Sequence, residues 1–448
     1  MTDFSIPPQD MLQSVLDACV SAGASGADAR LSASQGVSVS VRDGKLETIE
    51  RDEGAGLALR CFFGQRQANV SGTDLTADGI RLLAERCVSM AKAAPEDPYC
   101  GLAAIEDLSS DARDLDLEPD TDASPETLEN EALEAEAAAL AVDGIQQVAS
   151  CGSGWSRTER WLAATNGFTA HRAGGSSGVG LAAIAEKDGA MERDYASRSS
   201  RRRTDRLSPG EIGKLAGTRT IARLGPTKVE SQTADVIYDR RVSASLLSAF
   251  INAVSGTSIA RGVSFLKDRL GDRIFAPGIS IVDDPFRPRG MGSRFHDGEG
   301  RRVSTRNIIE DGVLSEWLLN GPAAKQLGLA PNGFSGLAFG DPPGIATSNL
   351  YLAAGTQTPA ELMAASGKGL LVTDMFGPSI NPNSGDYSVG VSGFWFENGE
   401  LAYPVSEVTI AGDLPGIFAR LVPANDLEFL GARDAPSVLV EGMSLAGA

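Results

Sequence analysis

The sequence predicts an α+β fold with two domains. At 448 residues the chain is longer than one ordinary domain, and its 51 glycines and 6% aromatic residues favour tight turns over a helical bundle. Strand-like alternation recurs around Asp-Gly and Asn-Gly pairs, which are typical of antiparallel hairpins. We expect an N-terminal α/β domain at residues 1–225, with antiparallel strands and flanking helices. Residues 226–448 are expected to form a mainly antiparallel, barrel-like β domain with a few helices.

The first 94 residues predict a helix, several antiparallel strands and a second helix. Residues 7–22 have the apolar spacing of an amphipathic helix that begins with two prolines. Residues 37–49 alternate polar and apolar side chains around Asp43-Gly44, which predicts a hairpin turn. A second strand pair follows over residues 56–71, and Thr76 is placed to cap the next helix.

The segment from Glu96 to Asp143 carries most of the net charge of −19, with sixteen Asp and Glu and one basic residue. We expect a loop over residues 95–121 and a helix that begins at Ser124-Pro125, with its outer face solvated. Strong acidity disfavours nucleic acid and anionic membranes as partners. Because the rest of the chain is close to neutral, this argument is weaker than the net charge suggests.

Residues 148–225 complete the predicted N-terminal domain. Asn166-Gly167 and Asp188-Gly189 are flanked by strand-like runs and predict two further hairpins. Ser208-Pro209-Gly210-Glu211 has the pattern of a capping box, with Pro at the first helical position. The helix it opens should end before Gly225-Pro226, where we place the domain boundary.

The C-terminal half repeats the same signals. Residues 236–238 predict an apolar strand, and residues 244–254 predict a helix. Asp311-Gly312 and Asn398-Gly399 predict hairpin turns, and Thr358-Pro359-Ala360-Glu361 predicts a second capping box that opens a short helix.

Cysteine usage and the N-terminus predict the compartment. The five cysteines are Cys19, Cys61, Cys87, Cys100 and Cys151. An odd number without CxxC spacing is typical of a reduced, cytoplasmic protein. The N-terminus has neither a basic nor an apolar leader, and no run approaches eighteen apolar residues. We therefore expect a cytoplasmic protein without a signal peptide or a membrane span.

The histidines argue against a metal centre. There are two, His171 and His296, and neither lies near a cysteine pair. A zinc site needs three or four ligands, and the sequence proposes no such set. We expect His171, which follows an Asn-Gly turn, to be a surface or packed residue.

One short motif could mark a nucleophile. Residues 174–178 match G-x-S-x-G, with Ser176 at the centre. A nucleophile elbow needs a strand before the motif and a helix after it, and here both flanks predict strands. Ser176 is the single named candidate for a hydrolase with another nucleophile.

Two groups of arginines stand out in the sequence, and either could contact phosphate or carboxylate groups. The first group is Arg193, Arg198, Arg201, Arg202, Arg203 and Arg206, and the second is Arg287, Arg289, Arg294, Arg301, Arg302 and Arg306. With few aromatic residues to stack on bases, nucleic acid is disfavoured. A solvated face or an acidic protein partner is favoured.

The segment FGPSINPNSGDYS, residues 376–388, is rich in polar and turn-forming residues between two predicted strands, 370–373 and 389–396. It is either an ordinary turn or a loop that lines a cleft. In the second case, we expect the cleft-lining residues, which would contact a peptide, to be Asn381, Asn383, Ser384, Asp386, Tyr387 and Ser388.

Several segments, taken in order, resemble the TldD/PmbA metallopeptidase family, and within it the PmbA type, also called TldE. They are residues 37–75, residues 236–256, PRGMGSRF at 288–295, and residues 372–401, which begin VTDMFGPSINPNSGDYS. The resemblance covers nearly the full length of the chain and depends on the order of many segments rather than on one motif.

The resemblance implies a lost metal site. TldD-type members have an HExxxH motif after a Leu-Leu pair, and a cysteine nearer the C-terminus completes the zinc ligands. Here Leu246-Leu247 is followed by Ser248 and Ala249, with Ala253 at the position of the second His. The third-ligand segment, residues 384–396, has no cysteine. The resemblance therefore implies no catalytic residue and no metal in this chain, and zinc in a partner subunit.

The function that the resemblance implies is that of a non-catalytic subunit in a two-component metalloprotease. Such a subunit would help to hold an unfolded peptide, added as a strand to a sheet edge, for a TldD-type partner. The alternative is a stand-alone homodimer that binds peptides or a protein without hydrolysis, in line with the family's description as a gyrase modulator. The sequence leaves open the substrate, the order of residues 96–143 and whether the degenerate site is an open pocket.

Overall fold

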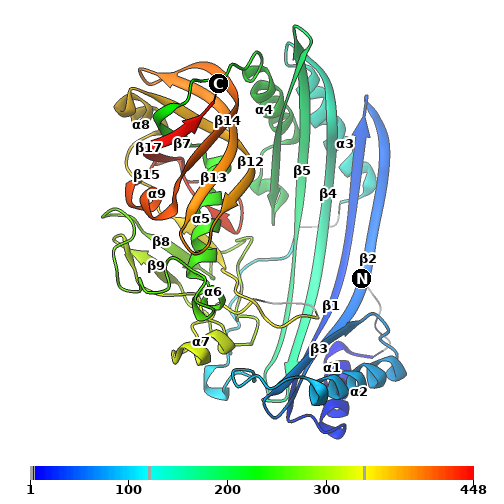
Figure 1. The fold of residues 1–448 in the computed structure, drawn as a ribbon. Coiled ribbons are helices and arrows are strands. Elements are labelled where there is room, and N and C mark those ends of the chain that lie inside the picture. Colours follow the sequence, from blue (N-terminus) through cyan, green and yellow to red (C-terminus); the bar gives the residue numbers. More distant parts are fainter. Residues whose placement is uncertain (1–3, 5, 120–122, 337–339, 448) are drawn as a thin grey trace.

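The computed structural model describes residues 4, 6–119, 123–336 and 340–447. Figure 1 shows one long antiparallel sheet, built by the N-terminal half, beside a β barrel and a smaller sheet built by the C-terminal half. The predicted α+β class is therefore confirmed. The boundary near residue 225 stays a prediction, in a segment between the helix that ends at Ala222 and the strand that begins at Gln232.

The long sheet has the strand order β3-β2-β1-β4-β5-β6. Its strands are β1 (Gly26–Arg42), β2 (Lys45–Phe63), β3 (Arg66–Gly72), β4 (Ile145–Ala164), β5 (Thr169–Lys187) and β6 (Ala190–Ser200). Hairpin turns join them where the sequence predicts: Asp43 and Gly44 have φ of 53° and 69°, which a two-residue type I′ turn requires.

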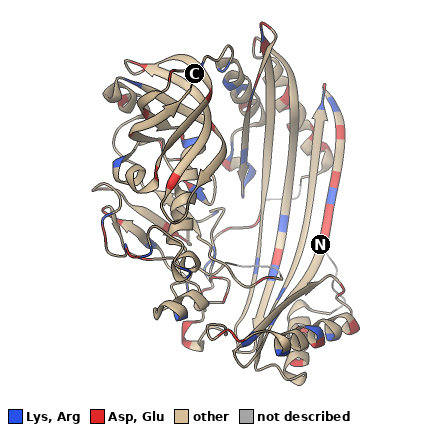
Figure 2. Ribbon diagram, in the orientation of Figure 1, with Lys and Arg blue, Asp and Glu red and all other residues tan. Residues whose placement is uncertain are grey.

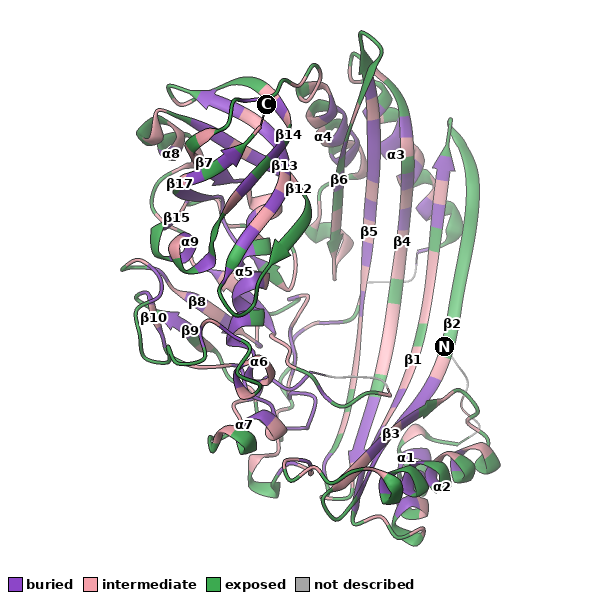
Figure 3. Ribbon diagram, viewed as in Figure 1, coloured by how far each residue is buried: buried purple, intermediate pink, exposed green. Residues whose placement is uncertain are grey.

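Part of β2 forms an open edge of this sheet. β3 pairs with β2 only from Leu57 onward, so residues 45–54 have β1 on one side and no strand of the described chain on the other. These residues are exposed (Figure 3) and include both basic and acidic side chains (Figure 2). Charges on an exposed edge oppose pairing with another chain.

Two helix pairs cover one face of the sheet at opposite ends. They are α1 (Pro8–Ser21) with α2 (Ala77–Ala93), and α3 (Pro125–Leu140) with α4 (Pro209–Ala222). Leu31 belongs to the core under the first pair and Val39 to the core under the second. Both occupy odd positions of β1 and so point to the same face. Arg30, on the other face, donates to the Gly298 carbonyl oxygen of the C-terminal half at 2.8 Å.

Helix α3 has a solvated outer face, as predicted, but two of its acidic residues are turned towards the rest of the protein. Glu136 is 2% exposed, and its carboxylate accepts from the backbone N–H groups of Asp43 and Gly44 at 2.9 and 2.8 Å. Glu131 accepts from Ser153, Arg203 and Arg206. Glu136 therefore holds the hairpin turn at residues 43–44 and Glu131 holds the loop after β6, while the outer face of the helix meets solvent.

The C-terminal half contains a closed barrel with the ring order β7-β12-β13-β14-β17, in which only β7 and β12 are parallel. Closure leaves these strands without free edges. The strands are β7 (Gln232–Tyr238), β12 (Lys368–Ile380), β13 (Asp386–Glu397), β14 (Glu400–Asp413) and β17 (Val438–Ala446), and β15 (Leu421–Pro423) is added to β17.

A second sheet and short helices complete this half. The sheet order is β10-β9-β8-β11-β16, with β8 (Ile281–Asp284), β9 (Arg306–Glu310), β10 (Val313–Leu314), β11 (Asn349–Leu352) and β16 (Arg433–Asp434). The helices of this half are α5 (Arg240–Val254), α6 (Gly256–Ala260), α7 (Gly321–Leu327), α8 (Pro359–Ser366) and α9 (Leu414–Arg420). The N-terminal half also has short 3₁₀ helices at Ile105–Asp107 and Arg203–Asp205.

The hairpin β12–β13 corrects the prediction of a long loop at residues 376–388. β12 continues to Ile380 and β13 begins at Asp386, so the connection spans only residues 381–385. Phe376 faces Gly390 across the pair, and Ser379 faces Ser388. Gly and Pro in this run mark irregular pairing within strands rather than a loop.

A buried ion pair joins the two halves. Asp194 of β6 is 4% exposed and accepts from both terminal nitrogens of Arg241 on α5, at 3.0 and 3.3 Å. Arg223, which follows α4, lies 3.8 Å from the same carboxylate and donates to Ser392 of β13 at 2.8 Å. These contacts fix the barrel against the last strand of the long sheet.

All five cysteines are free and buried. Within the described ranges, no helix has the length and apolar character needed to cross a membrane.

Candidate functional site

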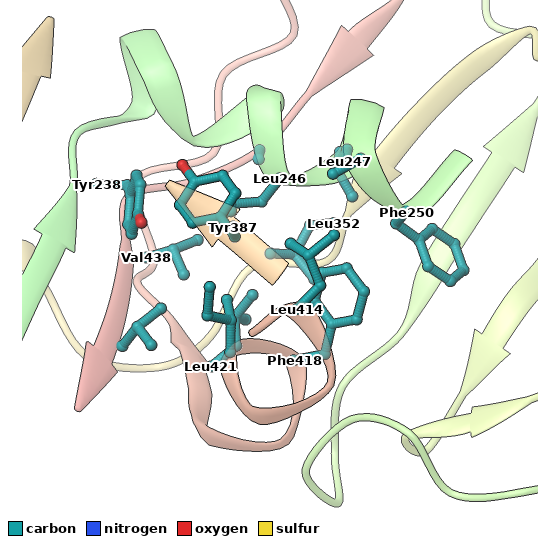
Figure 4. Close-up of a cluster of buried hydrophobic side chains, with 14 of the residues drawn as sticks. Tyr238, Leu246, Leu247, Phe250, Leu352, Tyr387, Leu414, Phe418, Leu421 and Val438 are labelled. Atoms are coloured by element: carbon teal, nitrogen blue, oxygen red, sulfur yellow. The ribbon is translucent and has the colours of Figure 1, made fainter. Parts of the chain in front are cut away.

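Helix α5 carries the positions to which the resemblance assigns the lost metal site. It begins at Arg240 rather than at Ala244, because Asp239 caps it by accepting from the Arg241 N–H at 2.9 Å. In the sequence, Asp239 was the residue that could have indicated a helix start at Arg240, because Asp is a favoured N-cap residue. Its buried side chains belong to the barrel core (Figure 4), and they include Leu246, Leu247, Phe250, Ile251 and Val254.

The three predicted positions differ in exposure. Ala249 and Ala253 are each 6% exposed, and Ser248 is half-buried. The Ser248 hydroxyl donates to the Ala244 carbonyl oxygen at 3.2 Å, within the helix. It also accepts from Nη1 of Arg433 on β16 at 3.4 Å. The hydroxyl is therefore engaged on both sides, and one of its neighbours is a guanidinium.

These residues do not fit a zinc ion. Zinc in proteins is held by imidazole, thiolate or carboxylate groups, whereas two methyl groups offer no ligand. The positive charge of Arg433 beside the remaining hydroxyl opposes a cation. Throughout the described residues, no group of three or more His, Cys, Asp or Glu is placed to hold a metal. That these three positions correspond to a metal site still rests on the resemblance and stays a prediction.

The outer face of α5 presents small polar side chains. Ser245 and Asn252 are exposed and lie three and four residues from Ser248, so the three share one stripe. The Ser245 hydroxyl lies 3.4 Å from the Met375 sulfur of β12, and the next residue, Phe376, is 51% exposed. The stripe thus runs between β12 on one side and Arg433 of β16 on the other.

Four of the hairpin residues predicted to line a cleft are exposed, namely Asn381, Asn383, Ser384 and Asp386, and Ser388 is half-buried. Their side chains bond locally: Asn381 accepts from the Asn383 N–H at 3.0 Å, and Ser384 donates to Asp386 at 2.6 Å. Such local bonds stabilise tight turns. Whether these residues line a cleft stays a prediction.

Tyr387 does not belong with them. It is 4% exposed and lies inside the barrel beside Tyr238 (Figure 4). Burial raises the pKa of the Tyr387 phenol to about 12 and also raises that of Tyr238. The reason is the alternation of a strand: Tyr387 lies between two residues of β13 that point outward, so its side chain points inward.

The other motif residues lie far from a catalytic arrangement. Ser176 sits within β5 and faces Ser156 across the sheet, so the strand-turn-helix context of a nucleophile elbow is missing. His171, on the same strand, is exposed, stacks on Trp161 with a centroid distance of 4.9 Å and lies 3.2 Å from Glu159. It is a surface residue, as expected.

The structure brings together two arginine groups that the sequence shows as separate. Arg198, Arg201 and Arg206 of the first group and Arg287 and Arg289 of the second line one cavity of about 860 Å³ between the two halves. Sequence reasoning identified both groups but had no signal for their meeting, because it depends on how the barrel docks on the sheet.

The fold and the α5 positions define a structural class: a long sheet with two helix pairs, joined to a barrel whose helix carries the candidate site. Solved structures share the fold. A candidate modulator of DNA gyrase from Bacteroides thetaiotaomicron is 25% identical with a TM-score of 0.91, and covers 98% of this chain and 99% of its own. TldE from Thermococcus kodakarensis has a TM-score of 0.87 at 19% identity, over 98% and 100% of the two chains.

Sequence comparison identifies the family. Three models match in order: PmbA/TldA metallopeptidase domain 1 at residues 27–91, the central domain at 118–224 and the C-terminal domain at 231–447. The chain belongs to the PmbA/TldA metallopeptidase family. It is 33% identical to Metalloprotease PmbA of Escherichia coli, over 94% of this chain and 92% of that protein. A homologue in Haemophilus influenzae is 32% identical over 98% and 96%.

Proposed function

We propose that this chain is the non-catalytic, PmbA/TldE-type subunit of a cytoplasmic metalloprotease, and that it acts on unfolded peptides with a zinc-bearing TldD-type subunit. Two full-length relatives named as PmbA metalloproteases or their homologues support the protease assignment. The structural similarity to a TldE protein supports the subunit type. Five free, buried cysteines are consistent with a reducing compartment.

The observation that carries the proposal is the chemistry of α5. At the positions where TldD-type members have two His and a Glu, this chain has one engaged hydroxyl and two buried methyl groups. A water molecule there would have neither a metal to lower its pKa nor a carboxylate to take its proton. Peptide hydrolysis therefore needs groups from another chain.

This subunit's own contribution would be to position the peptide. An extended peptide satisfies its main chain by adding to a strand edge, and unfolded segments have those groups free. β6 is the end strand of the long sheet and lies beside the barrel, to which Asp194 ties it. The small polar stripe of α5 and the exposed Phe376 lie beside this region and would contact the side chains of the peptide.

The test is reconstitution. Three samples are compared: the purified chain, a TldD-type subunit and their mixture. Each is assayed for cleavage of an unfolded peptide, and native mass spectrometry measures the mass of the complexes it contains. We expect a mixed complex, and cleavage by the mixture at least about tenfold faster than by this chain alone.

Other outcomes would overturn the proposal. Cleavage by this chain alone at the rate of the mixture would require a catalytic site within it. A homodimer that ignores the TldD-type subunit and binds peptide without cleaving it would instead support the stand-alone binding protein.

A further inference from the structure

The cavity of about 860 Å³ between the two halves is built from five stretches of chain. The end of β6, the loop after it and α4 supply one wall, which includes Arg198 and Arg219. Residues 287–291, residues 428–431 and Arg240, the first residue of α5, supply the other. Its volume lies within the range of ligand pockets, roughly 300–1,000 Å³. Figure 2 places the basic residues of this region between the long sheet and the barrel.

The charges that line this cavity do not balance. Seven arginines and three acidic residues face it. Arg240 pairs with Glu428, and Arg289 with Asp205, while Arg206 pairs with Glu131 from outside the cavity lining. The third acidic residue, Glu211, is occupied in the capping box of α4 with Ser208.

Four arginines therefore remain without an ion pair to a carboxylate among the described residues: Arg198, Arg201, Arg219 and Arg287. Arg201 has a structural role, since it donates to three backbone carbonyls, those of Gly175, Gly290 and Met291. The other three make fewer polar contacts. Arg198 donates to Ser197 and Arg219 to Tyr195, each through one nitrogen to one carbonyl oxygen.

Arg287 is held by aromatic faces instead of by an anion. Its guanidinium carbon lies 3.4 Å from the ring centroid of Phe429 and 5.2 Å from that of Tyr351. Stacking fixes the plane of the guanidinium and leaves its edge for a carboxylate. Burial lowers the pKa of Arg198 and of Arg219. Glu428 opposes this shift at Arg198, and Asp194 and Asp239 oppose it at Arg219, while neighbouring arginines repel both guanidinium groups. An anion in the cavity would relieve this repulsion.

We propose that this cavity binds the carboxylates of an acidic peptide segment, with Arg198, Arg219 and Arg287 as the anion-binding residues. Guanidinium groups take carboxylates in a bidentate, geometrically specific way. The remaining lining is partly apolar, with Leu207, Leu215, Met291 and Leu430 placed to contact the methylene groups and neighbouring side chains of such a segment. The proposal does not depend on the partner-subunit role, because this chain alone forms the cavity.

Nucleic acid fits the cavity less well. The aromatic ring that could stack on a base, Phe429, is already covered by Arg287. A bounded cavity also holds a short segment better than a long strand. Inorganic phosphate would leave the apolar wall without a contact.

The cavity lies at the N-terminal end of the helix that carries the candidate site. Arg240 lines it and begins α5, and Ser248 lies eight residues further along the same helix, about 12 Å at the helical rise. The lining segment 428–431 leads directly to Arg433, which contacts Ser248. An acidic segment held in the cavity would thus place the following residues of the same peptide along the polar stripe of α5.

The test measures binding to this chain alone by fluorescence anisotropy. The probes are a labelled decapeptide of alternating Glu and Ala, its Gln counterpart, and a single-stranded DNA decamer. We expect the Glu peptide to bind at least about tenfold more tightly than the Gln peptide, and more tightly than the DNA. Arg198→Gln combined with Arg219→Gln should weaken it at least about tenfold.

The matched control is Arg51→Gln with Arg261→Gln, which removes the same charge from two exposed sites and should leave binding unchanged. Leu430→Glu is a second probe: this side chain is 44% exposed, so the fold should persist while a carboxylate occupies the cavity and weakens binding. Equal binding of the two peptides, equal loss in the control, or tighter binding of DNA that the cavity variant abolishes would overturn the proposal.

Discussion

At the residue scale, burial shifts the pKa values of two neighbouring ionisable groups, His296 and Asp297. His296 is 4% exposed, and its Nδ1 lies 2.7 Å from the Asp297 carbonyl oxygen, to which it donates. Burial, together with the charges of Arg172 and Arg294, lowers the pKa of His296 to about 4. Burial and Glu299 raise the pKa of the Asp297 carboxyl to about 6. Two neighbouring groups therefore act on stability in opposite directions as the pH falls.

The pH dependence of the unfolding free energy tests the pKa shift of His296. The folded state keeps His296 neutral, so its contribution is present above the unfolded pKa of about 6.5 and is lost as the pH falls towards 4. The His296→Gln variant has no imidazole to protonate, so it does not lose this part of the unfolding free energy at low pH. It keeps the stabilising effect of Asp297, whose raised pKa favours the folded state as the pH falls. Between pH 7 and pH 4, we expect the wild type to lose about 3 kcal/mol of unfolding free energy relative to the variant. Parallel profiles in urea titrations at several pH values would contradict this.

The ion pair between the two halves gives a second prediction at this scale. Asp194→Ala removes the carboxylate that Arg241, 12% exposed, binds through both terminal nitrogens and leaves it Asp239 at 3.8 Å, which should lower the free energy of unfolding by about 3 kcal/mol. The control is Asp78→Ala, which breaks an exposed pair with Arg81 and should leave the free energy of unfolding nearly unchanged. Urea unfolding measures both, and equal effects would show that the Asp194 pair does not hold the halves together.

At the scale of elements, close packing of helices decides how the sheet is covered. A Cβ atom on Gly213 of α4 would lie 2.1 Å from the Ala135 carbonyl oxygen of α3, so the two helices cross in near contact there. Thr220, further along α4, is fully buried and bonds to the Ala216 carbonyl oxygen at 2.9 Å. The close approach of α3 and α4 is therefore possible because Gly213 has no side chain.

Substitution at the crossing tests this packing. Gly213→Val must push α4 away from α3 and should destabilise the protein by about 3 kcal/mol. Gly210→Ala in the same helix meets only the flexible end of Glu134, at 3.0 Å, and should have a much smaller effect. Thermal unfolding compares the two variants. A small effect of Gly213→Val on thermal stability would mean that α3 and α4 can move apart without destabilising the protein.

Elements with local signals could be predicted from the sequence. The Asp-Gly turns need a positive φ, and the two capping boxes form with both reciprocal bonds, so short-range chemistry was sufficient. In the small sheet of β8 to β11 and β16, only the β9–β10 hairpin turn at Asp311-Gly312 was predicted, because the other strands, of two to four residues, are held by distant partners. The prediction of a loop at residues 376–388 was wrong, since its Gly, Pro and Asn residues are typical of turns but lie largely within paired strands.

The candidate site was predictable only in part. The identity of residues on α5 follows from the sequence, but the engagement of Ser248 by Arg433 joins positions 185 residues apart. The inward orientation of Tyr387 depends on where β13 begins, a boundary that no local residue fixes. The cavity between the two halves could not be predicted either, because it forms only where the C-terminal half packs against the long sheet and α4.

At the scale of the whole molecule, charge distribution explains the acidic segment. Asp107 pairs with Arg301, Asp116 with Arg202 and Arg289, and Glu131 with Arg203 and Arg206. Carboxylates from residues 96–143 thus neutralise much of both arginine groups and link the sheet, the helices and the C-terminal half. The arginines proposed to bind anions in the cavity are ones that this segment does not pair with.

The proposed function requires that this chain completes a protease without providing its metal. The most direct measurement is the zinc content of the purified chain, of a TldD-type subunit and of their isolated complex, taken on the samples used for peptide cleavage. We expect no stoichiometric zinc in this chain, and one zinc ion for each TldD-type subunit in an active complex. Stoichiometric zinc bound to this chain alone would contradict it and would place metal ligands outside Ser248, Ala249 and Ala253.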